Sequence, residues 1–249
     1  MDDVKRLLDE YDKLCETASD EEVEQWLQDV CARYDEEASA DVPGRAALYN
    51  ELGAFYKHRE IFDKGEAAFR AAKALLEMPV RAGDEKGCCG RESLMDGQYG
   101  APTADRRETA DYATVLNNLA GLYRLTKRFD EAEALFAQAE SVYRADENTP
   151  KDLLASCSNN LALVYMDQGR WADALSRFER AMEILRDAPD KEYERATTDG
   201  NMTVALARLG RIEEAKSHLT AASETFTRLL GPDSDVCKGL AYLAKMLGA

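Results

Sequence analysis

The chain of 249 residues carries 48 acidic and 32 basic side chains, for a formal net charge of -16, and 45% of its residues are hydrophobic. This hydrophobic content suffices for a sizeable folded core, which excludes a largely disordered chain. A surface this negative repels phosphate backbones and anionic lipids, so we expect no nucleic-acid partner and no membrane partner. The chain opens without a signal-peptide pattern and its apolar runs are short, which predicts a soluble, cytoplasmic protein.

Residues 1–40 hold most of the negative charge, with 14 acids against four bases. Apolar residues nevertheless recur there at helical spacing, from Val4 to Leu14 and from Val23 to Tyr34. This pattern predicts two amphipathic helices with acidic outer faces. We interpret the segment as an acidic N-terminal helical cap; the alternatives are a degenerate extra repeat and a docking surface for a basic partner.

Ser19 is followed three residues later by Glu22, a spacing that is typical of a capping box. In this arrangement each side chain bonds to the backbone N–H of the other residue, which satisfies two otherwise unpaired donors. The pair therefore predicts where the second of the two N-terminal helices begins.

An internal repeat organises the rest of the chain. The pattern NLAxxY at residues 118–123 recurs 42 residues later at 160–165, and more weakly 41 residues further on, from Asn201. A second pattern, AxxxFxxA, occurs at 132–139 and again at 174–181. Each unit is therefore predicted to be two amphipathic helices joined by a short turn, with small residues where the helices cross.

The repeats place the expected helices along the chain. Residues 234–247 have room for one more helix that caps the last repeat. A Gly-rich insertion at about 79–107 separates the first two repeats; we interpret it as a passive excursion, with a lid or binding loop as the alternative. First helices are expected near 45–58, 109–126, 151–168 and 190–208, and their partners near 62–77, 129–145, 171–187 and 212–229.

The two patterns resemble the tetratricopeptide repeat (TPR), and the period of 41–42 residues is similar to the variant found in kinesin light chains. The linker at 230–236 and the helix opening at 111–120 strengthen the likeness. The resemblance implies an all-α fold, a right-handed superhelical solenoid of stacked helix-turn-helix repeats over residues 41–249. It also implies that the first helix of each pair lines a concave groove.

Asparagines recur about one repeat apart on the expected outward faces of the first helices. An amide offers both a donor and an acceptor, so it can pair with a peptide backbone of any sequence; the resemblance implies the same role. Basic residues nearby could select an acidic ligand residue. The alternative is that the asparagines bond to neighbouring helices and set the repeat packing. The candidate peptide-binding residues are Asn50, Asn117, Asn118, Asn159, Asn160, Asn201, Lys57, Arg124 and Arg208.

No sequence pattern predicts catalysis: a Gly-rich phosphate loop, a GxSxG elbow and an HExxH motif are all missing. Two histidines and six scattered cysteines predict neither a metal site nor a cofactor site. We therefore predict a non-enzymatic scaffold that binds an extended peptide or partner protein. The alternatives are a self-assembling structural protein and a ligand sensor or enzyme whose site is covered by the 79–107 loop. The partner's identity and the oligomeric state stay open.

Overall fold

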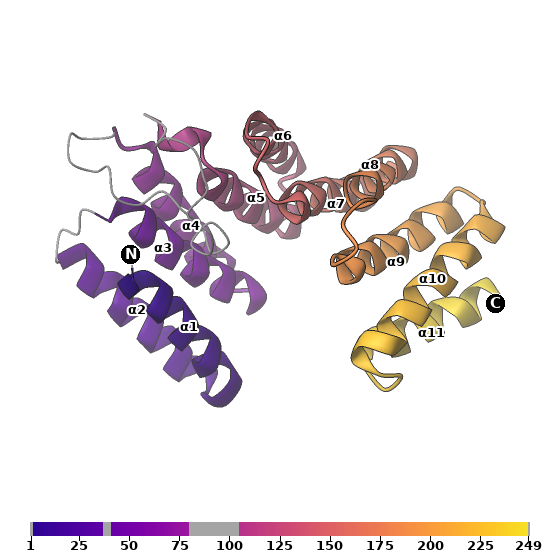
Figure 1. The fold of residues 1–249 in the computed structure, drawn as a ribbon, viewed down its shortest axis with the longest axis horizontal. Helices are drawn as coiled ribbons and strands as arrows, with labels where there is room; N and C mark the ends of the chain where they lie inside the picture. The colour runs from indigo at the N-terminus through magenta and orange to yellow at the C-terminus, as the bar shows by residue number, and fades with distance from the viewer. Residues whose placement is uncertain (1, 37–40, 80–104, 249) are drawn as a thin grey trace. The chain divides into compact units, whose positions relative to one another are not determined.

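The computed structural model describes residues 2–36, 41–79 and 105–248. These residues form eleven α-helices and one short 3-10 helix, and no β-strand occurs within the described ranges (Figure 1). The chain divides into two compact units, residues 1–148 and 149–249. The predicted fold class, an all-α solenoid of helix-pair repeats, is confirmed.

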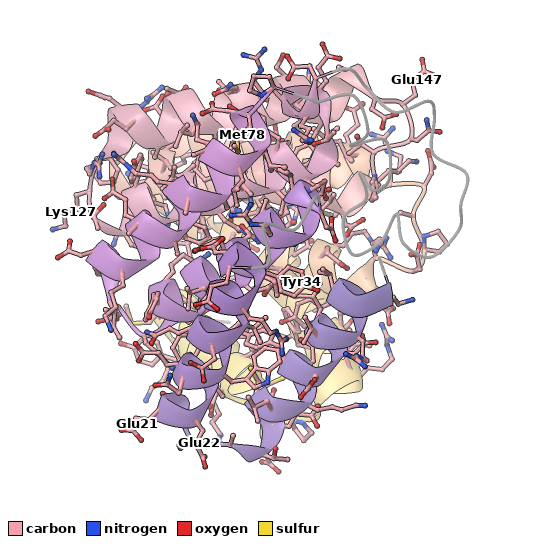
Figure 2. All side chains as sticks on the ribbon, turned by 90° about the vertical axis from the view of Figure 1, so that its left-hand side faces the viewer. Glu21, Glu22, Tyr34, Met78, Lys127 and Glu147 are labelled. Carbon is pink, nitrogen blue, oxygen red and sulfur yellow. The ribbon has the colours of Figure 1, made fainter. Side chains whose placement is uncertain are left out.

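The first unit begins with α1 (Asp2–Thr17) and α2 (Asp20–Glu36). The predicted capping box is present, because Ser19 N–H donates to Glu22 Oε2 at 2.8 Å and Glu22 N–H donates to Ser19 Oγ at 3.4 Å. The rings of Tyr11 and Trp26 stack at 6.4 Å and fill the space between the two helices. Tyr34 lies inside the unit, whereas Glu22 lies at its outer edge (Figure 2).

Acidic residues of α2 attach it to the first helix pair, α3 (Val42–His58) and α4 (Phe62–Glu77). Asp35 pairs with Arg45 at 2.5 Å, Glu24 pairs with Lys64 at 2.8 Å, and Asp20 pairs with Arg59. Part of the negative charge of the N-terminal segment is therefore neutralised within the first unit. The division into a cap, residues 1–40, and a solenoid, residues 41–249, stays a prediction.

The second helix pair of this unit is α5 (Ala110–Leu125) and α6 (Phe129–Ala145). Small residues allow close helix crossings, as the sequence predicted: a Cβ on Gly53 of α3 would lie only 2.6 Å from the ring of Phe69 on α4. Between the pairs, Glu66 of α4 accepts hydrogen bonds from Tyr123 Oη at 3.0 Å and from Arg128 at 2.8 Å. These contacts join α4, the second helix of the first pair, to α5 and to the turn that follows it.

The second unit contains two helix pairs and a final helix. The pairs are α7 (Lys151–Asp167) with α8 (Trp171–Ile184), and α9 (Glu192–Arg208) with α10 (Ile212–Leu230); α11 (Asp235–Leu247) follows. The repeated Ala174 and Phe178 of α8 are fully buried. Leu240 of α11 joins Phe226 of α10 in a common apolar cluster, so α11 packs onto the last pair.

The turn inside each pair repeats one backbone conformation. Glu60, Lys127, Gly169 and Gly210 have φ values of 60°, 61°, 76° and 76° at equivalent places between the two helices. Glycine adopts this left-handed conformation without the steric cost that a side chain brings. Two of the four pairs therefore tolerate a mildly strained residue at the turn.

The insertion predicted at 79–107 is described only at its ends. Residues 80–104, which include Cys88 and Cys89, lie outside the described ranges. A short 3-10 helix, η1 (Arg106–Glu108), follows them, and its buried Arg106 donates to the backbone carbonyl of Met78 at 3.0 Å. Met78 is labelled in Figure 2. This bond joins the two ends of the insertion, so the chain leaves α4 and returns to α5 at nearly the same place.

Candidate functional site

Two of the predicted asparagines bond to each other in the first unit. Asn118 of α5 donates from Nδ2 to Oδ1 of Asn50 on α3 at 3.0 Å. Asn50 is 9% exposed, so it lies under its neighbour and does not face outward as the helical spacing suggested, while Asn117 and Asn118 are half-buried. Within the described ranges, Nδ2 of Asn50 and Oδ1 of Asn118 have no hydrogen-bond partner, so the pair keeps one donor and one acceptor.

In the second unit, Asn159 of α7 bonds to the next first helix, α9. Its Nδ2 donates to Thr198 Oγ1 at 2.8 Å, and Thr198 in turn donates to the Glu194 carbonyl at 2.9 Å. The Oδ1 of Asn159 is buried and has no partner among the described residues. Asn160 and Asn201 are half-buried. The side-chain amides of Asn118 and Asn159 thus each form a hydrogen bond to a neighbouring first helix.

The three predicted basic residues have different surroundings. Lys57 and Arg124 lie in the last turns of α3 and α5 and are half-buried, and the charge of Arg124 acts on the Lys57 ammonium. Arg208 of α9 is exposed, and its guanidinium lies 5.5 Å from the ring centroid of Trp171. Lys57 and Arg124 lie in the same unit, where the charge of Arg124 lowers the pKa of Lys57, while Arg208 belongs to the other unit.

Two ionisable groups in the first helices were not singled out from the sequence. Desolvation raises the pKa of Asp111 on α5 to about 6. On α9, the buried Asp199 lies 2.6 Å from Nδ1 of His218 on α10. From the sequence, Asp111 is only an acid in the first turn of a helix, where such residues are common. Asp199 and His218 are 19 residues apart, and no sequence pattern predicts that they lie in contact.

The described residues contain no group of three or more His, Cys, Asp or Glu side chains arranged to hold a metal ion. What the first helices present is a set of amides, one basic pair and a solvent-facing guanidinium. Such groups hold backbone and carboxylate groups by hydrogen bonding. None of the helices in the described ranges is both long and apolar enough to cross a lipid bilayer.

The tetratricopeptide repeat model matches residues 111–187, which span α5 to α8. The chain contains tetratricopeptide repeats over residues 111–187. The match covers the two most regular repeats, and the remaining helix pairs of the TPR protein follow the same pattern of pairing. A comparison with curated proteins found no significant match.

Solved structures share the fold of this TPR protein at low sequence identity. BtubC (BKLC) from P. vanneervenii is 18% identical with a TM-score of 0.67, covering 93% of this chain and 84% of that one. A putative kinesin light chain from Podospora anserina with nearly identical TPR-like repeats is 16% identical with a TM-score of 0.64, covering 92% and 98%. PlcR of Bacillus thuringiensis, solved with the peptide PapR7 and DNA, is 12% identical with a TM-score of 0.61, covering 99% and 74%. The kinesin-light-chain neighbour agrees with the predicted type of repeat.

Proposed function

We propose that this TPR protein is a non-enzymatic interaction scaffold that binds an extended peptide segment of a partner protein along its first helices. The amide pair of the first unit carries the proposal. Among the described residues, the bond between Asn118 and Asn50 leaves the Nδ2 group of Asn50 as a donor and the Oδ1 atom of Asn118 as an acceptor for a ligand. A peptide group offers one carbonyl and one N–H, which this pair complements whatever the side chain of the ligand.

The comparison with PlcR supports the same use of the fold. That protein has been solved with a bound peptide, and its fold covers almost the whole of this chain. Because the identity is low, the likeness supports a peptide as the class of ligand and does not indicate its sequence.

The strength of single hydrogen bonds limits what the asparagines contribute. Each is worth about 1 kcal/mol net, whereas micromolar binding requires about 8 kcal/mol. Contacts with ligand side chains must therefore supply most of the affinity. The asparagines would fix the direction and register of the peptide backbone.

Selection from a random displayed peptide library, followed by fluorescence anisotropy with a labelled selected peptide, tests the proposal. Replacing Asn50 and Asn118 together with alanine removes both amides of the pair, and we expect about 30-fold weaker binding. The matched control is Gln25→Ala, which removes an amide on α2 that bonds to Asp29. Unchanged affinity of the double variant, with an unchanged helical melt, would contradict the proposal.

Self-assembly is the second candidate, favoured by the outer face of α11. Tyr242 and Met246 are 65% and 68% exposed, which is unusual for two large apolar side chains on one helix. If this face joins copies of the chain, sedimentation velocity will show a concentration-dependent oligomer, and Met246→Glu will reduce it. A monomer at all concentrations removes this candidate.

A further inference from the structure

A groove of about 310 Å³ lies between α1 and α2 in the first unit. The buried Leu7 and Val30 line it together with the half-buried Trp26. The groove thus combines an apolar lining with charges of both signs, which suits a partner surface that carries an aromatic ring beside charged groups. The exposed charged residues that line it are Arg6, Glu10, Asp29 and Arg33.

Three of these residues form one stripe along α2. Trp26, Asp29 and Arg33 follow one another at intervals of three and four residues, so they lie on the same face of the helix. The stripe covers seven residues, which is about 10 Å along the helix axis. From its N-terminal end it presents an aromatic ring, an acid and a base.

The outer face of α11 in the second unit carries the complementary pattern. Asp235, Lys238 and Tyr242 also follow one another at intervals of three and four residues, and they cover the same length of helix. Tyr242 is 65% exposed. From its N-terminal end this second stripe presents an acid, a base and an aromatic ring, which is the first stripe read backwards with its charges inverted.

The charged groups of both stripes can accept new partners at little cost. Asp235 and Lys238 pair with each other at 3.2 Å, and an ion pair this exposed contributes little to stability. Asp29 accepts a hydrogen bond from Gln25 at 2.8 Å, and a carboxylate has room for several donors. An approaching helix therefore loses little when these groups change partners.

We propose that α11 of one copy packs antiparallel against α2 of a second copy, in the groove between α1 and α2. A parallel arrangement would place the carboxylate of Asp235 over the indole ring of Trp26, whose face is negative. The contact rests on the self-assembly candidate described above and names the surface that meets α11. In the antiparallel arrangement each residue of one stripe meets its complement: Tyr242 with Trp26, Lys238 with Asp29, and Asp235 with Arg33.

This contact joins two different surfaces of the chain. Each added copy therefore presents another groove and another α11, so assembly continues beyond a dimer and gives a ring or a filament. A contact between two α11 helices would instead stop at a dimer. Because exposed charge pairs border the contact, we expect assembly to weaken as the salt concentration rises.

Sedimentation velocity of the full chain, at low and high salt, tests the contact through one charge pair. We expect oligomers larger than a dimer for the parent at rising concentration. Asp29→Lys and Lys238→Glu should each lower the association constant about tenfold, because each brings like charges together. An equal mixture of the two variants should recover assembly, since the groove of the first and α11 of the second again carry opposite charges.

Glu21→Lys is the matched control, because it makes the same charge change at an exposed position of α2 outside the groove (Figure 2). It should assemble like the parent. If it weakens assembly as much as Asp29→Lys does, net charge explains the effect and the contact is overturned. The contact is also overturned if both single variants are weakened, with unchanged helical melts, and their mixture does not recover.

Two further outcomes separate this contact from self-assembly as such. If Asp29→Lys assembles like the parent while Met246→Glu does not, self-assembly through α11 stands and the groove is not its partner. If the parent is a monomer at every concentration, self-assembly and this contact both fail.

Discussion

Replacing Gly53 with alanine perturbs the closest helix crossing of the first unit. The new Cβ would lie 2.6, 2.7 and 2.8 Å from three ring carbons of Phe69, whose side chain is fully buried. These distances are too short for carbon atoms, so either the ring or one of the two helices must shift. The equivalent positions of later repeats, Ala120 and Ala162, already carry a Cβ and are fully buried.

The size of the effect follows from two opposing terms. Overpacking of a well-packed core costs about 1–3 kcal/mol, whereas alanine in a helix interior gains about 1 kcal/mol over glycine. We therefore expect Gly53→Ala to lower the free energy of unfolding by about 1 kcal/mol. Gly121→Ala is the matched control in the same unit, because its Cβ would meet only Nζ of Lys57 at 4.0 Å. This control should gain about 1 kcal/mol, since it keeps the helix term without the clash.

Urea unfolding followed by circular dichroism at 222 nm measures both variants. The difference between them isolates the overpacking term, because the helix term is common to both. A Phe69→Leu change should reduce the cost of Gly53→Ala, so the double variant should be more stable than the sum of the single effects predicts. If Gly53→Ala is as stable as Gly121→Ala, the close approach of α3 and α4 is not what selects glycine at this position.

Two further predictions concern packing and charge. Ala174→Leu adds a large side chain to a fully buried position of α8, and we expect a loss of about 1–3 kcal/mol in urea unfolding; a variant that unfolds like the parent would contradict this. Burial raises the pKa of Asp111 to about 6, above its unfolded value of about 3.9, so its stabilising contribution is present below about pH 4 and is lost as the pH rises through 6. Asp111→Asn should therefore be more stable than the parent at pH 7, by about 3 kcal/mol, and should match it at pH 4.

The repeat pattern determined most of the helix positions. Two predicted helices, 62–77 and 129–145, have the bounds of α4 and α6, because capping turns and apolar periodicity coincide there. The connection after α8 was predicted less well, since the helix ends at Ile184 and not at 187. Arg195 of α9 donates to the carbonyls of Leu185 and Ala188 and organises this connection. A hydrogen bond from a side chain to backbone carbonyls several residues earlier does not change the hydrophobic pattern. The sequence therefore did not predict where this helix ends.

The candidate site was less accessible to sequence reasoning. Helical spacing placed Asn50 on the outward face of its helix, but Asn118 of the next repeat bonds to it, and it is 9% exposed. Spacing within one helix indicates a face, whereas burial depends on which neighbour covers that face. Lys57 likewise appears in the sequence as one base near a helix end. Its position over Gly121 depends on how α3 and α5 pack.

The net charge of -16 does not oppose the binding of an acidic residue in a peptide. Residues 1–40 contribute -10, from 14 acids and four bases, and three of those acids are paired with bases of the first helix pair and its turn. At physiological ionic strength, charges beyond about 8 Å are largely screened, so a single ligand carboxylate responds mainly to the charges in its immediate surroundings. A nucleic acid would instead have to cover a wide surface with closely spaced phosphates, and it would meet the many other acids as well. The same composition that disfavours a polyanion is therefore compatible with recognition of one acidic residue in a peptide.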